Sequence, residues 1–327
     1  MYTSLALVFV LLFGVALTAP ANPVPMSHPI PSSGIPIPFP PLGGVSHDSI
    51  VQFEDVKKLS PSMSAALGLL RAHHYEAAQA AFQKVQQSRP QEAFAYRGEV
   101  EASQRLNTLN ATVARYRRHL AAAERDKKSG TNSSVRLAVL HWALGEVVMM
   151  RNGYYLKFVG DAPSILGNES REQFLEALDI DPNLLVAHLS LAAYYEHDSI
   201  GKGSLARLQY KEALRLRPDL YQIRYLHALT WDRPGVLVNK AQLVKQGAPL
   251  TEDMDKMPEK AIPEYLALIQ DHPKYAPPYY ILGDDYWFTD KAKSKFYFEK
   301  YLELGSREGH AWKRAKSIVD YMNEHPS

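Results

Sequence analysis

The chain has 327 residues, of which 46% are hydrophobic and 22% are charged, and this composition is typical of a folded protein. Its formal net charge of +2 is too balanced to favour binding to nucleic acid or to an anionic membrane surface. The absence of cysteine excludes disulfides, thiolate metal ligands, cysteine nucleophiles and a lipid attached through cysteine.

The first 47 residues contain no Lys, Arg, Asp or Glu. Within them, residues 5–18 form an apolar run that suits the core of a signal peptide and is short for a membrane span of about 20 residues. Small residues at 19–21 favour cleavage before Asn22. Residues 1–21 are therefore predicted to be a signal peptide or, if uncleaved, a membrane anchor. The protein is expected to be periplasmic or secreted, or anchored facing outside the cytoplasm, with no other membrane contact.

A proline-rich segment follows, with nine prolines between residues 20 and 41. Proline disfavours both helix and sheet, so an extended chain of up to roughly 70 Å is expected, at about 3.1 Å per residue. We interpret residues 22–45 as a spacer. A ligand for a proline-binding module is the alternative.

Helical periodicity begins after the spacer and is clearest in residues 183–218. Residues that recur three and four apart, namely Leu185, His188, Leu191, Ala192 and Tyr195, share one helical face and predict a first amphipathic helix. Gly201 and Gly203 break it, and a second helix with the same spacing stops at Pro218.

The second helix carries four residues at fixed spacing: a small residue, an aromatic, a small or aliphatic residue and a proline. This pattern occurs four times. The copies are Ala78, Phe82, Val85 and Pro90; Ser170, Phe174, Ala177 and Pro182; Ala206, Tyr210, Ala213 and Pro218; and Ala261, Tyr265, Leu268 and Pro273. The pattern resembles the tetratricopeptide repeat, a helix–turn–helix unit of about 34 residues. The resemblance implies an all-α, right-handed solenoid over residues 46–325 that serves as a scaffold for binding.

Six helix pairs fit this register, and two insertions interrupt them, near residues 152–168 and 232–258. The amphipathic segment 310–323 is expected to be a capping helix, because the last repeat needs cover for its exposed apolar face. Insertions in solenoids usually map to loops on one face.

Residues suited to catalysis or metal binding are sparse. His73, His74 and Glu76 lie together, but adjacent histidines point to different faces of a helix, and a metal site needs three or four convergent ligands. The chain contains no GxSxG, HExxH, GxGxxG or phosphate-loop motif. We therefore expect no enzymatic activity, no metal and no cofactor.

Three N-glycosylation sequons occur, with acceptors at Asn110, Asn132 and Asn168. Short sequons also arise by chance, so the sequence leaves their use open.

The resemblance also implies where a partner binds, because first helices line the concave wall of such solenoids. One wall site of the family lies two residues before the leucine of its Leu-Gly pair. By repeat register this site corresponds to Trp142, Leu189, Tyr225 and Tyr280, and Trp287 and Phe288 extend the surface one turn further. These positions predict an aromatic groove for a protein or peptide segment. The alternative is that the same aromatic residues pack against a neighbouring helix.

A second wall site holds Glu146, Ala193, Leu229 and Asp284, and lacks the Lys and Asn of repeats that clamp chaperone tails. The sequence thus predicts an exported, non-enzymatic scaffold that binds a protein partner through its concave face. The alternative is a scaffold whose two insertions form a small-ligand pocket or an active site.

Overall fold

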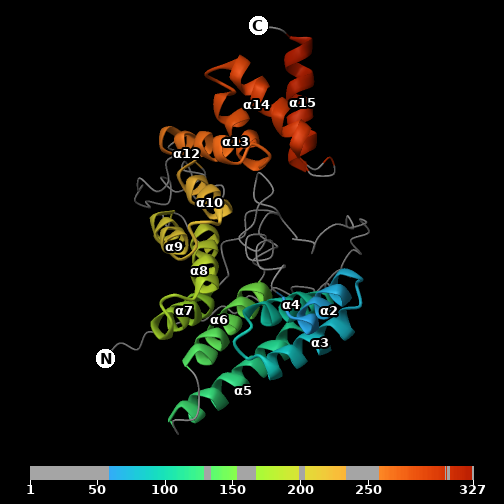
Figure 1. The fold of residues 1–327 in the computed structure, drawn as a ribbon, viewed down its shortest axis with the longest axis vertical. Coiled ribbons are helices and arrows are strands. Elements are labelled where there is room, and N and C mark those ends of the chain that lie inside the picture. The colour runs from blue at the N-terminus through green and yellow to red at the C-terminus, as the bar shows by residue number, and fades with distance from the viewer. Residues whose placement is uncertain are drawn as a thin grey trace, which may run out of the picture. The chain divides into compact units, whose positions relative to one another are not determined.

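The computed structural model describes residues 59–128, 134–152, 167–198, 203–232, 258–305, 307 and 310–325. These residues form thirteen helices and no strand, which confirms the all-α prediction (Figure 1). The leader, the spacer and most of both predicted insertions lie outside the described residues. The helices are α2 (Pro61–Arg71), α3 (Tyr75–Ser88), α4 (Ala93–Arg105), α5 (Leu109–Lys128), α6 (Ser134–Arg151), α7 (Gly167–Ile180), α8 (Leu185–Asp198), α9 (Gly203–Leu216), α10 (Tyr221–Asp232), α12 (Pro258–Asp271), α13 (Pro277–Tyr286), α14 (Lys291–Leu304) and α15 (His310–Glu324).

Each helix packs mainly on its neighbours in chain order. Helix α6 packs on α7, α8 on α9, α10 on α12 and α13 on α14, and each of these pairs matches a predicted helix pair. Contacts also join helices that are next but one in the described order, namely α2 with α4, α4 with α6 and α6 with α8. Helix pairs that bury their apolar faces against the adjacent pair are the arrangement expected of a repeat protein.

Side chains cap the first turns of two helices. Ser60 caps α2, since its side-chain oxygen accepts a hydrogen bond from the Met63 backbone N–H at 3.3 Å, and Pro61 takes the first helical position. Asp290 caps α14 in the same way through the Lys293 N–H at 3.0 Å. In the turn between α2 and α3, His73 has a positive φ of 62°, and in the turn between α4 and α5, Asn107 has a φ of 57°.

The four copies of the second-helix pattern are buried, as predicted, at their first three positions. These positions are Ala78, Phe82 and Val85 in α3; Ser170, Phe174 and Ala177 in α7; Ala206, Tyr210 and Ala213 in α9; and Ala261, Tyr265 and Leu268 in α12. Apart from Ser170, these side chains lie in three successive hydrophobic clusters that run from α2 to α15. Local packing of this kind follows from the repeat pattern itself.

Three glycines in first helices allow an aromatic ring to approach the backbone. A Cβ atom on Gly98 would lie 2.3 Å from Phe82 Cζ, one on Gly145 2.5 Å from Phe174 Cε1, and one on Gly283 2.8 Å from Phe298 Cδ1. All three rings are fully buried and cannot swing out into solvent. Glycine at these positions of α4, α6 and α13 is therefore a packing requirement.

Replacing Gly98 by Ala is expected to lower the free energy of unfolding by about 1–3 kcal/mol, because the new methyl group overlaps the Phe82 ring. Chemical denaturation of the full chain measures the effect. Gly68 is the matched control, since it lies inside α2 with nothing within 4 Å of an added Cβ. Gly68→Ala is expected to stabilise the protein by about 0.5–1 kcal/mol through helix propensity. The same change in stability from both substitutions would contradict the close Gly98–Phe82 approach.

Candidate functional site

The structure buries four of the five side chains predicted to bind a partner. Trp142, Leu189, Tyr225 and Tyr280 are between 0% and 3% exposed. A partner cannot contact a side chain in this state without a rearrangement of the helices. For these four residues, burial favours packing, the alternative that the sequence left open.

Their surroundings explain the burial. The Trp142 indole N–H in α6 donates a hydrogen bond to Ser190 Oγ in α8 at 2.9 Å. The Tyr225 ring lies 5.8 Å from the Tyr275 ring and 6.0 Å from the Tyr265 ring. Tyr280 in α13 contacts Phe298 and Tyr301 of α14 edge to face. The Trp142 contact thus joins consecutive helix pairs. The ring contacts of Tyr225 with Tyr265 and of Tyr280 with α14 lie within one pair.

The second wall site also serves contacts between helices. Glu146 in α6 accepts a hydrogen bond at 2.6 Å from Arg97 in α4, and its side chain is 1% exposed. Asp284 in α13 accepts one at 2.8 Å from Arg314 in α15. At both positions an acidic side chain therefore pairs with an arginine outside its own helix pair. The arginine comes from α4 for Glu146 and from α15 for Asp284.

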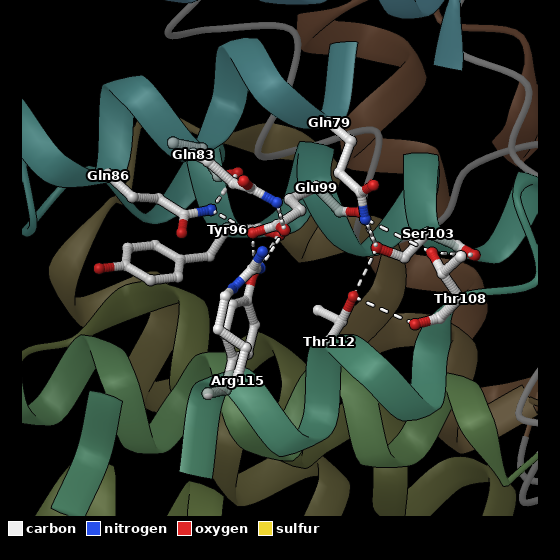
Figure 2. A network of polar contacts seen from close by, with 11 residues as sticks. Gln79, Gln83, Gln86, Tyr96, Glu99, Ser103, Thr108, Thr112 and Arg115 are labelled. Carbon is white, nitrogen blue, oxygen red and sulfur yellow. Dashed lines mark hydrogen bonds and ion pairs between the residues drawn. The ribbon is translucent and has the colours of Figure 1, made fainter. Parts of the chain in front are cut away.

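A polar network around Glu99 joins α3, α4 and α5 (Figure 2). The fully buried carboxylate of Glu99 accepts hydrogen bonds from Gln83 at 2.8 Å, from Gln86 at 2.7 Å and from the Tyr116 hydroxyl at 2.9 Å. Arg115 forms an ion pair with the same carboxylate.

The network continues along α4 to a group of hydroxyls. The Ser103 hydroxyl donates to the Glu99 backbone carbonyl at 2.7 Å and lies 2.8 Å from the Thr112 hydroxyl, and Gln79 donates to Ser103 Oγ at 2.9 Å. Figure 2 shows these side chains converging from the three helices.

Both Glu99 oxygens are occupied by protein donors, so this carboxylate is not placed to accept a proton from a substrate. Burial, and then the nearby Glu99 carboxylate, raise the pKa of the Tyr116 hydroxyl well above its ordinary value. Burial also raises the pKa of Tyr96 to about 12. Both phenols therefore stay neutral near neutral pH. The arrangement fixes the relative positions of three helices.

Burial raises the pKa of the Glu196 carboxyl group in α8 to about 8, although a hydrogen bond from the Tyr210 hydroxyl at 3.1 Å acts in the opposite direction. A raised pKa by itself does not make a catalytic site, because a nucleophile or second acid–base group must lie within reach. Tyr210, whose side chain is buried, is its hydrogen-bond partner in the described structure.

No group of three His, Asp or Glu side chains that could hold a metal occurs in the described residues. His73 is exposed and its ring stacks on Tyr75 at 5.7 Å, and His74 directly precedes α3. The predicted absence of a metal and of enzymatic activity stays a prediction. None of the described helices combines the length and the hydropathy needed to cross a membrane.

Trp287, the fifth predicted residue, lies in an exposed aromatic cluster. We call this cluster the C-terminal aromatic surface and define it as Trp287, Phe288, Lys291, Tyr321 and His325. The Trp287 ring lies 6.4 Å from Phe288 and 6.3 Å from Tyr321, and Tyr321 stacks on His325 at 4.5 Å. Phe288 is 89% exposed, the highest value among the exposed large hydrophobic side chains of the described residues.

Two local features place this surface. Helix α13 ends at Tyr286, and Asp290 starts α14, so Trp287 and Phe288 occupy the short turn between them. Helix α15 buries Ala315, Val319 and Met322, which leaves Tyr321 exposed on another side of the helix. Lys291, in the first turn of α14, places its Nζ 3.2 Å from the centre of the Trp287 ring.

The sequence identified Trp287 and Phe288 but not Tyr321, His325 or Lys291. Helical spacing indicates that Tyr321 is exposed, because Tyr321 lies outside the apolar stripe of its own helix. That it lies beside Trp287 depends on how α15 packs on α14, and no pattern within either helix specifies this.

No family model matches the chain, and no curated protein matches it at a significant level. Its function is therefore inferred from its own residues and their geometry.

Proposed function

We propose that the chain is an exported scaffold of the tetratricopeptide-repeat type, without catalytic activity, that binds a protein partner through the C-terminal aromatic surface. The observation that carries the proposal is the exposure of Phe288 beside Trp287 and Tyr321. The exposed large aromatic side chains of the described residues are Phe288, Phe296 and Tyr321. They lie in the turn after α13, in α14 and in α15.

The repeat part of the proposal is supported by the recurrence of one packing scheme. Buried small and aromatic residues recur at the same spacing in α3, α7, α9 and α12, and three glycines of first helices meet buried phenylalanine rings. In this proposal the helix pairs form a right-handed solenoid and α15 is its cap. Support for the cap comes from Ala315 and Val319, which join the hydrophobic cluster of α8–α14.

The partner part follows from the chemistry of the exposed rings. Exposed aromatic patches commonly mark interaction sites, and Trp and Tyr are enriched among the residues that dominate binding energy. Lys291 covers one face of Trp287 and places a positive charge beside the exposed rings. A partner segment with apolar side chains for Phe288 and a carboxylate near Lys291 matches this surface.

A crosslinking experiment tests the proposal. A photoreactive phenylalanine analogue at position 288 is expected to crosslink to a partner in extracts of the source organism. Adding Trp287→Ala and Tyr321→Ala to the same chain is expected to reduce the yield at least tenfold, the loss that corresponds to about 1.4 kcal/mol or more of binding energy. These exposed or half-exposed positions are expected to affect folding little.

The control places the same analogue at Leu208, which is 51% exposed on α9. It is expected to give no crosslink to the same protein. An equal yield from positions 208 and 288, or a yield from position 288 that does not depend on Trp287 and Tyr321, would contradict a specific partner at this surface.

A further inference from the structure

We infer that Asn110 and Asn168 are acceptors of N-linked glycans and that they are modified before their helices fold. The inference rests on the proposed export, because glycan transfer requires entry into a secretory compartment. Both residues begin an Asn-X-Ser/Thr sequon, and both side chains are exposed in the described structure. A glycan on either nitrogen therefore extends into solvent and leaves the packing of the helices intact.

The hydroxyl residues of the two sequons are placed differently from the asparagines. Thr112 is 2% exposed, and its hydroxyl lies 2.8 Å from Ser103 Oγ inside the polar network of Figure 2. Ser170 is fully buried at the second-helix position that packs against the preceding helix. Residues two apart on a helix do not share a face, so folding separates each acceptor from its hydroxyl.

The middle residue of the Asn168 sequon contacts two neighbouring helices. Glu169, its middle residue, accepts a hydrogen bond from Arg117 of α5 at 2.5 Å and lies 3.7 Å from Arg151 of α6. A transferase that reads the acceptor and the hydroxyl together cannot reach both in this state. Modification must therefore precede the folding of α5 and α7.

The transfer reaction needs a lipid-linked oligosaccharide pyrophosphate as the donor. The side-chain amide nitrogen of the acceptor forms a bond to the anomeric carbon of the oligosaccharide. The bond between that carbon and the pyrophosphate oxygen breaks, and the lipid pyrophosphate leaves with the electron pair. One amide proton passes to a base of the transferase.

The test uses the full chain in a eukaryotic secretory host, with Asn132→Gln as background because Asn132 lies outside the described residues. Two glycans are expected, seen as two steps on a gel that peptide N-glycosidase removes and as Asn-to-Asp conversion in mass spectra. Asn110→Gln and Asn168→Gln are each expected to remove one step. Asn183→Gln, an exposed asparagine outside any sequon, is expected to remove none.

A second version of the chain carries an unrelated signal peptide in place of residues 1–21. Glycans on this version but not on the chain with its own leader would refute the proposed export and leave the inference standing. No glycan on either version would overturn the inference, and a glycan at one acceptor only would overturn it for the other.

The timing is tested with folded protein made in a bacterial cytosol. Purified transferase and donor are expected to modify a synthetic peptide of residues 106–116 but to leave Asn110 and Asn168 of the folded chain unmodified. Equal modification of the peptide and the folded chain would show that folding does not hide the hydroxyls.

Discussion

Replacing Tyr225 by Ala is expected to lower the free energy of unfolding by about 3–5 kcal/mol, the usual cost of removing a large buried aromatic side chain. Tyr225 is fully buried, and its ring packs against Tyr265 of α12 and against Tyr275. The deleted side chain leaves a cavity between α10 and α12 that the surrounding helices cannot fill without moving. Denaturant unfolding of the full chain, followed by circular dichroism, measures the loss.

Phe288→Ala is the control for this prediction, because it removes a comparable ring from a side chain that is 89% exposed. It is expected to change the unfolding free energy by no more than about 0.5 kcal/mol. The pair of variants also separates the two interpretations of the aromatic pattern. A stable Tyr225→Ala protein with a binding defect would restore the groove hypothesis for the buried positions, whereas a large loss of stability supports packing.

Replacing Arg97 by Ala is expected to cost about 3–5 kcal/mol, because the substitution leaves the Glu146 carboxylate buried without its ion-pair partner. Glu146 is 1% exposed, and in the described residues its second oxygen, Oε1, has no hydrogen-bond partner. Little else within the described structure is therefore available to stabilise the charge once the guanidinium is gone. Equilibrium unfolding in urea is the measurement.

The double variant Arg97→Leu with Glu146→Leu tests the mechanism of that loss. Removing both charges eliminates the penalty of an unpaired buried carboxylate, so most of the lost stability is expected to return. Lys316→Ala provides the comparison, since it breaks an exposed ion pair with Asp320 in α15 and is expected to change stability little. If Arg97→Ala and Lys316→Ala had equal small effects, the Arg97–Glu146 pair would not be buried in solution.

The sequence by itself determined the helices, their order and most of their core. Periodicity of 3.6 residues, Pro and Gly punctuation and the repeated small–aromatic pattern are local signals, and a helix in a repeat protein buries its apolar stripe against near neighbours. For this reason Phe82, Phe174, Tyr210 and Tyr265 could be placed in the core without coordinates.

Only the tertiary structure decided which aromatic residues are accessible. Trp142, Tyr225 and Tyr280 occupy the same position of the repeat. A residue at that position can line a groove or pack against a neighbouring helix, and the sequence is equally compatible with both. Whether these rings are buried or accessible depends on how closely neighbouring helices approach. That distance is set by contacts with side chains far apart in sequence, such as Ser190 for Trp142 and Arg314 for Tyr280.

The same physical reason explains the polar contacts that the sequence did not reveal. The Glu99 network gathers donors from three helices, and the C-terminal aromatic surface combines a turn, the first turn of α14 and the exposed side of α15. Each helix is specified by its own periodicity, whereas contacts between residues such as Trp287 and Tyr321 depend on the angle and distance at which two helices pack.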